Sequence, residues 1–127
     1  MKRLTKAEEE IMQLIWALER CTVSDLRSTI QQKNHGAKPP HSTISTIVRI
    51  LEEKGFVDHK AYGRTYEYFP IVSKKEYSRK TIDKLVSDYF EGSMNHLVSF
   101  LVKEKNINKE ELSRLLDEFD ESDNSQS

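Results

Sequence analysis

The chain has 127 residues, of which 32% are charged and 36% are hydrophobic, and its formal net charge is −1. This length leaves room for one modest core or two very small ones, which argues against a complete multidomain enzyme. The mean hydropathy is −0.69, and no apolar run reaches the roughly 20 residues that a membrane-spanning helix needs. No apolar stretch follows the first basic residues either, so we expect no secretory signal, no membrane insertion and a cytoplasmic protein.

The charge is distributed unevenly along the chain. Residues 1–72 carry 11 Lys and Arg against 9 Asp and Glu, whereas residues 73–127 carry 9 against 12. A local basic surface on a nearly neutral protein is enough for contact with the DNA backbone. This signal is weak by itself, because a charge-rich surface is usually only a solvated one.

Three short helices are predicted in the first half of the chain. The first begins at a Thr5–Glu8 capping box, and the second begins at Thr22. The third follows Pro39-Pro40, with His41 or Ser42 as its cap. Apolar residues recur at the spacing of one helical face in all three. The residues predicted to face the core are Ile11, Leu14, Ile15, Leu18, Val23, Leu26, Ile30, Ile44, Ile47, Val48 and Leu51.

After Gly55 the pattern becomes that of a β-hairpin. Residues 56–61 and 65–69 are rich in aromatic and β-branched residues, and Tyr62-Gly63-Arg64 between them supplies the turn. Three short helices followed by a hairpin is the order of a winged helix, whose third helix enters the major groove. We therefore predict a mainly α chain with a small β-hairpin, in which residues 1–72 form a winged helix-turn-helix DNA-binding domain.

Residues 73–119 are predicted to form a helical dimerisation region. Ser73, Ser93 and Asn108 each precede an amphipathic helix. These helices carry more apolar surface than a short tail can bury, which favours pairing with a second copy over folding back onto the winged helix. Residues 120–127 are polar and acidic, and we expect a disordered tail. The predicted dimerisation residues are Ile82, Leu85, Val86, Tyr89, Leu97, Val98, Leu101, Leu112, Leu115, Leu116 and Phe119.

The third predicted helix carries a polar face suited to DNA. Its hydroxyl and guanidinium side chains lie off the apolar stripe, where they suit phosphates and base edges, although a solvated helix face has the same pattern. The predicted wing adds basic side chains that suit phosphates. The predicted DNA-binding residues are Ser42, Thr43, Ser45, Thr46 and Arg49 on the helix, and Lys60 and Arg64 on the wing.

No catalytic site is predicted. The sequence has no glycine-rich phosphate loop, no paired His and Glu of a metalloprotease and no nucleophile with a plausible base. The four histidines lack the spacing of a metal site, and the single cysteine, Cys21, is expected to be a small buried apolar residue. We therefore expect no enzyme activity, no bound metal and no cofactor.

Several motifs resemble the penicillinase-repressor family. They are Leu4-Thr5-Lys6-Ala7-Glu8 with Ile15-Trp16, the helix from Ser42 to Gly55, and Gly63-Arg64-Thr65-Tyr66-Glu67-Tyr68. The resemblance runs from about Leu4 to Phe119. It implies a homodimeric repressor whose two winged helices bind the halves of an inverted-repeat operator in double-stranded DNA. In the antibiotic-resistance members, a membrane sensor peptidase relieves repression through cleavage within the dimerisation region.

The chain departs from that family in two places. The copper-responsive members carry a cysteine-rich motif near the C-terminus, and nothing here matches it, so copper sensing is not expected. The resistance repressors are cut at an Asn-Phe pair, and the matching pair here is Ser99-Phe100, which is the candidate cleavage site. Two other functions stay open, namely a winged helix that binds proteins and a ligand-gated regulator resembling the MarR family.

Overall fold

The computed structural model describes residues 2–105, 107–114 and 117. The chain divides into two compact units, residues 1–78 and residues 79–127. The predicted dimerisation residues Leu115, Leu116 and Phe119 and the predicted tail at 120–127 lie outside the described residues. The elements are α1 (Lys6–Leu18), α2 (Val23–Asn34), α3 (His41–Glu53), β1 (Val57–Tyr62), β2 (Thr65–Pro70), α4 (Lys74–Tyr89) and α5 (Met94–Glu104).

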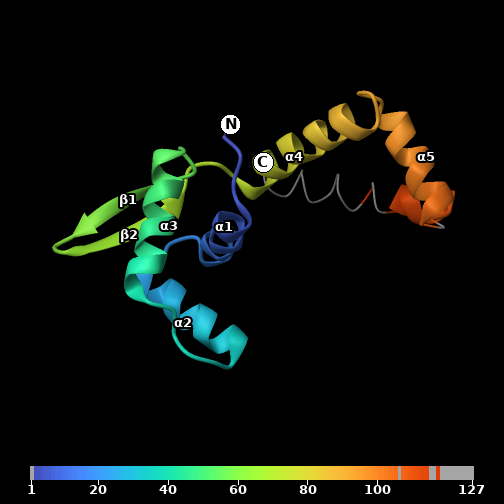
Figure 1. Cartoon of the computed structure of the whole chain (residues 1–127). Coiled ribbons are helices and arrows are strands. Elements are labelled where there is room, and N and C mark those ends of the chain that lie inside the picture. The colour runs from blue at the N-terminus through green and yellow to red at the C-terminus, as the bar shows by residue number, and fades with distance from the viewer. Residues whose placement is uncertain (1, 106, 115–116, 118–127) are drawn as a thin grey trace. The chain divides into compact units, whose positions relative to one another are not determined.

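The first unit has the winged-helix order of three helices and a hairpin, which confirms the predicted mainly α fold (Figure 1). Helix α1 begins where predicted, since the Thr5 hydroxyl accepts the N–H of Glu8 and the Glu8 carboxylate accepts the N–H of Thr5, both at 3.2 Å. The same reciprocal pair joins Thr22 and Asp25 at the start of α2. Each box satisfies two backbone donors that have no partner inside the helix.

Helix α3 begins differently from the prediction. Pro40 occupies the N-cap position with ψ 141°, and no side chain caps the helix. The prediction of a His41 or Ser42 cap is therefore wrong. Proline suits a helix start because its φ is fixed and it lacks an N–H. The helix therefore begins at His41, and the side chains of His41 and Ser42 lie in its first turn.

The hairpin is one residue tighter than predicted. Strands β1 and β2 pair in register from Val57 opposite Pro70 to Tyr62 opposite Thr65, which leaves a two-residue loop, Gly63-Arg64. The prediction had placed Tyr62 in the turn. Gly63 has a φ of 64°, the left-handed conformation that short hairpin loops require at this point.

The segment between α1 and α2 pairs with the wing through an isolated β-bridge. Cys21 donates its N–H to the carbonyl of Tyr68 at 3.0 Å and accepts the N–H of Tyr68 at 2.7 Å. The Cys21 side chain is buried, as predicted, and burial raises the pKa of its thiol to about 12. The raised pKa keeps the thiol protonated at neutral pH, the form that is the weaker nucleophile.

The core of the first unit lies around α3, with α1 and the hairpin on its two sides (Figure 1). Leu18 was predicted in this core but is 38% exposed, because it is the last residue of α1 and the chain turns away at Glu19, which has a φ of 66°. Met12 was not predicted and is fully buried. The core consists of Leu4, Ile11, Met12, Leu14, Ile15, Cys21, Leu26, Ile44, Val48, Leu51, Phe56, Val57 and Tyr68.

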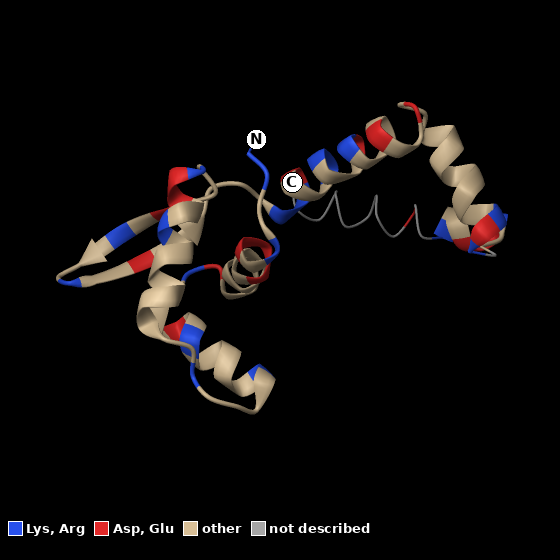
Figure 2. Ribbon diagram, in the orientation of Figure 1, with Lys and Arg blue, Asp and Glu red and all other residues tan. Residues whose placement is uncertain are grey.

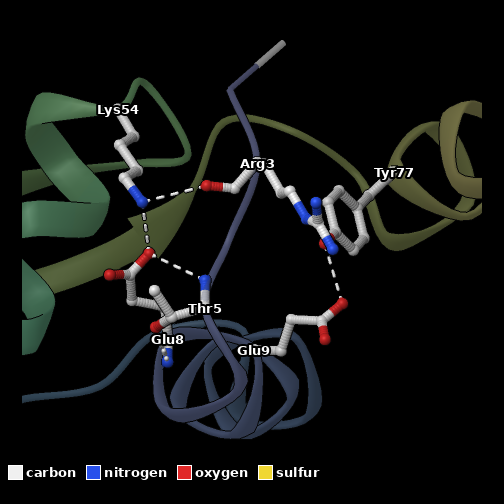
Figure 3. Close-up of polar contacts among 6 residues, drawn as sticks. All are labelled: Arg3, Thr5, Glu8, Glu9, Lys54 and Tyr77. Atoms are coloured by element: carbon white, nitrogen blue, oxygen red, sulfur yellow. Dashed lines mark hydrogen bonds and ion pairs between the residues drawn. The ribbon is translucent and has the colours of Figure 1, made fainter.

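A set of polar contacts joins the N-terminal segment and α1 to the end of α3 and the start of α4 (Figure 3). The ammonium group of Lys54 donates to the buried carboxylate of Glu8 at 2.5 Å and to the carbonyl of Arg3 at 2.9 Å. The hydroxyl of Tyr77 donates to Glu9 Oε1 at 2.7 Å. The first turn of α4 is therefore part of the first unit, although the sequence placed the boundary after residue 72.

The Glu8–Lys54 pair predicts a measurable contribution to stability. The hydrogen bond from Lys54 holds the pKa of the Glu8 carboxyl below its usual value of 4.5, despite the opposing effect of burial. Lys54→Met should lower the free energy of unfolding near pH 7 by about 2 kcal/mol, because a carboxylate that is nearly buried loses its charged donor. Urea denaturation measures this change, with the exposed Lys33→Met as the control.

The pH dependence of this contribution has a fixed sign. A carboxyl whose pKa is lower in the folded state stabilises the fold above its unfolded pKa and loses that contribution as the pH falls through its folded pKa. The difference in stability between the wild-type chain and Lys54→Met should therefore shrink below about pH 4.5. A constant difference down to pH 2 would show that the lysine acts through packing alone.

The second unit is built on two helices joined by a short turn. Helix α4 ends at Tyr89, and the chain reverses through Glu91 and Gly92, both with positive φ. Ser93 caps α5 by accepting the N–H of His96 at 3.2 Å. Residues 109–114 are helical too, after the predicted cap Asn108. Among the described residues, no helix is long and apolar enough to cross a membrane.

Candidate nucleic-acid interface

Helix α3 has one buried face and one exposed polar face. Ile44, Val48 and Leu51 repeat every three or four residues and are buried in the core. Ile47 is partly buried and packs against the same core, whereas the polar residues on the remaining face of the helix point away from it. Of the predicted helix residues, Ser42, Thr43, Thr46 and Arg49 are exposed and Ser45 is half-buried.

The half-buried Ser45 lies in a pocket of about 320 Å³ between the helices and the wing. Arg64, from the hairpin loop, lines the same pocket. The structure thus brings together two predicted residues that are 19 positions apart and belong to different elements. The other lining residues are Thr22, Val23 and Ser24 at the start of α2, His41 on α3, and Thr65, Tyr66 and Tyr68 on β2.

Lys60 is not part of this arrangement. Side chains alternate between the two faces of a strand, so Lys60 lies on the face opposite to that of its neighbour His59, whose ring stacks on Tyr66 at 4.2 Å. Its register partner is Glu67, and its ammonium group lies 5.8 Å from the ring centre of Tyr62. Lys60 is exposed and lies on the side of the wing that faces away from the pocket.

The distribution of charge around α3 is compatible with DNA phosphates that lie on either side of the helix. Figure 2 shows α3 mostly without charge, with acidic residues at its C-terminal end, both basic and acidic residues on the hairpin, and basic residues in the loop before the helix. Burial raises the pKa of the Tyr68 hydroxyl, so this lining group stays neutral and can both donate and accept hydrogen bonds.

Only Ser45 and Arg64 of the lining residues were predicted as part of the site. The lining residues that were not predicted are Thr22, Val23, Ser24, His41, Thr65, Tyr66 and Tyr68. Thr22 and Ser24 were assigned only to the cap and first turn of α2. Their position is a signal that could have identified them, because the first helix of a helix-turn-helix crosses the DNA backbone. Tyr66 is 47% exposed, and a large aromatic side chain exposed on a short strand is the corresponding signal on the wing.

The predicted dimerisation residues of the second unit differ in burial. Val86 is buried, whereas Ile82, Leu85 and Tyr89 are exposed by 41%, 42% and 76%. Leu97, Val98 and Leu101 on α5 and Leu112 beyond it are half-buried.

The candidate cleavage pair lies in the middle of α5. Ser99 is exposed, and Phe100 is 43% exposed, with its ring centre 5.5 Å from that of Phe90. Because both residues are helical, the peptide bond between them is in a regular backbone.

Comparisons with known proteins agree with this arrangement. The family model described as penicillinase repressor matches residues 4–121. The methicillin resistance regulatory protein MecI of Staphylococcus aureus strain N315 is 27% identical over 88% of this chain and 89% of its own length. The penicillinase repressor of Bacillus licheniformis is 22% identical over 96% and 93%. A solved complex of the protein hsRosR-S1 shares the fold at 15% identity, with a TM-score of 0.52 over 98% of this chain and 96% of that one.

Proposed function

Since the chain belongs to the penicillinase repressor family, we propose that it represses transcription by binding an inverted-repeat operator in double-stranded DNA as a homodimer. The observation that carries this proposal is the exposed polar face of α3 with Arg64 of the wing beside it. In this proposal Ser42, Thr43, Thr46 and Arg49 meet base edges and phosphates in the major groove. Arg64 contacts a phosphate next to the groove.

The second unit supports the proposal of a homodimer. It exposes large apolar side chains on both α4 and α5. Exposed apolar surface of this kind favours burial in an interface with another chain. A second copy of the same surface gives a closed two-fold pair, whose symmetry matches that of an inverted repeat. The interface comprises the predicted residues Ile82, Leu85, Val86, Tyr89, Leu97, Val98, Leu101 and Leu112, with Leu115, Leu116 and Phe119 beyond the described part.

We also propose that repression ends through cleavage between Ser99 and Phe100. The exposure of both side chains supports this assignment. The relevant protease is a membrane sensor peptidase, and the repressor itself acts in the cytoplasm without catalytic activity. Cleavage here separates the second half of α5, from Phe100 to Glu104, and everything beyond it from the rest of the dimerisation region.

Two substitutions distinguish the proposed roles of helix and wing. Arg64→Ala should weaken binding to all DNA sequences alike and lower the slope of log affinity against log salt by about one unit, since one phosphate contact is lost. Arg49→Ala should cost about 1–3 kcal/mol and relax sequence preference at one position in each half-site, as expected for a base contact. Fluorescence anisotropy at several salt concentrations measures both effects, after a footprint on the upstream DNA has located the operator.

The same titration tests the proposed function itself. A wild-type chain whose binding shows no salt dependence makes no phosphate contacts and would instead be a winged helix that binds proteins. Unchanged binding in both arginine variants would show that DNA meets another surface of the chain.

A further inference from the structure

A second group of side chains converges at the base of the wing, where α3 ends and β1 begins. Glu52 lies on the last turn of α3, and Asp58 and His59 are the second and third residues of β1. One ligand atom from each, two carboxylate oxygens and an imidazole nitrogen, lies within 4.8 Å of the other two. The turn at Gly55, which has a φ of 85°, folds the strand back against the helix and brings the three together.

The three side chains are held in place before any ligand arrives. His59 Nδ1 is hydrogen-bonded to Glu52 Oε1, and the His59 ring stacks on Tyr66 at 4.2 Å with an interplanar angle of 19°. Asp58 Oδ1 accepts the N–H of His59 at 2.8 Å. This N–H points away from β2, because the opposite residue, Tyr68, uses both of its backbone groups to pair with Cys21.

The composition of the cluster selects the kind of ligand. Two carboxylates and one neutral imidazole carry two negative charges, which a divalent cation balances. An imidazole suits zinc, cobalt or nickel, whereas magnesium and calcium prefer oxygen ligands alone. The side chains of Glu52 and His59 are 32% and 30% exposed, so a bound ion would be partly shielded and would keep a free position for water.

We propose that Glu52, Asp58 and His59 form a binding site for a divalent transition-metal ion, with three protein ligands and water. The proposal is independent of the proposed DNA binding and departs from the expectation that the chain holds no metal. Two ligands of a tetrahedral zinc ion lie about 3.3 Å apart. Binding an ion would therefore draw the three ligand atoms, which lie within 4.8 Å of one another, closer together. The ion would tie the end of α3 to the first strand of the wing.

The test is a calorimetric titration of the purified full-length chain with Zn²⁺, after a chelator has removed bound metal. We expect saturable binding of one ion per chain and a higher melting temperature with Zn²⁺ present, because the ion binds the folded state alone. Glu52→Gln should weaken binding by at least about tenfold, since even substitutions behind the ligands have effects of this size. Glu53→Gln, one residue further along α3 and exposed, is the matched control and should bind like the wild-type chain.

Asp58→Asn provides a variant in which the fold is retained. Its amide oxygen can still accept the N–H of His59, but it is a much poorer metal ligand than a carboxylate. His59→Gln, compared with His96→Gln on α5, tests the imidazole in the same way. Loss of the one-ion binding in the three cluster variants, with circular dichroism unchanged in Asp58→Asn, supports the site. No saturable binding, or binding that Glu52→Gln and Asp58→Asn leave unchanged, would overturn it.

Discussion

Replacing Leu85 with aspartate should convert the proposed dimer into a monomer and lower its affinity for the full operator by about 10² to 10⁴-fold. Leu85 is 42% exposed on α4, so the charge does not disturb the core of the isolated chain but would be buried in a paired one. Two linked half-site contacts raise the effective concentration of the second contact, and a monomer loses this gain without losing any contact to DNA.

Sedimentation and binding to two DNA probes together test this prediction. Ser87→Asp, an exposed position two residues away on the same helix, is the control and should leave the dimer intact. Leu85→Asp should sediment as a monomer and bind a single half-site as tightly as the wild-type chain does. A monomer that keeps full affinity for the whole operator would contradict the proposed role of the second unit.

The elements that could be predicted are those in which local signals and packing agree. The capping boxes at Thr5 and Thr22 are complete in the sequence, and the apolar spacing of α1 and α3 continues through each helix. The start of α3 was missed because Pro40 caps by its backbone angles, whereas the prediction considered only side chains that accept hydrogen bonds. Leu18 was misassigned because periodicity alone does not show where a helix passes beyond its neighbour.

The sequence predicted the helix residues of the candidate DNA site and Arg64 of the wing, but not the other residues that line the pocket. The exposed face of α3 follows from the helical period, but the pocket that joins Ser45 to Arg64 depends on how the hairpin lies against α3. The position of Lys60 depends in the same way on strand register, because a shift of one residue reverses every side chain of a strand. The loop length of a hairpin sets its register, and the prediction placed Tyr62 in the turn rather than in the strand.

The cluster of Glu52, Asp58 and His59 was missed for a related reason. Metal sites are identified in sequences by ligands that recur at helical or short-loop spacings, and this group has neither. A helix end, a left-handed turn at Gly55 and a strand start bring it together. The histidine was judged by its distance from other histidines, although its partners in the structure are carboxylates.

Cleavage between Ser99 and Phe100 should release the operator as completely as the loss of the dimer does. A protease needs an extended substrate, so α5 must first open locally, and the contact of Phe100 with Phe90 opposes that opening. In induced cells, mass spectrometry should find a fragment of the wild-type chain that ends at Ser99. Phe100→Ala changes one side of the scissile bond and should leave the chain intact and the gene repressed.

Phe90→Ala separates recognition of the bond from the stability of the helix. This variant loses the same ring contact as Phe100→Ala but leaves the Ser99–Phe100 pair unchanged. It should therefore be cut at least as fast as the wild-type chain, because α5 opens more often once the contact is gone. If both variants resist cleavage, the contact between the two rings positions the segment for the protease. The protease then does not recognise Phe100 itself. Derepression while all of the protein stays uncut would contradict cleavage. It would indicate induction by a bound effector or by a change in the protein's abundance.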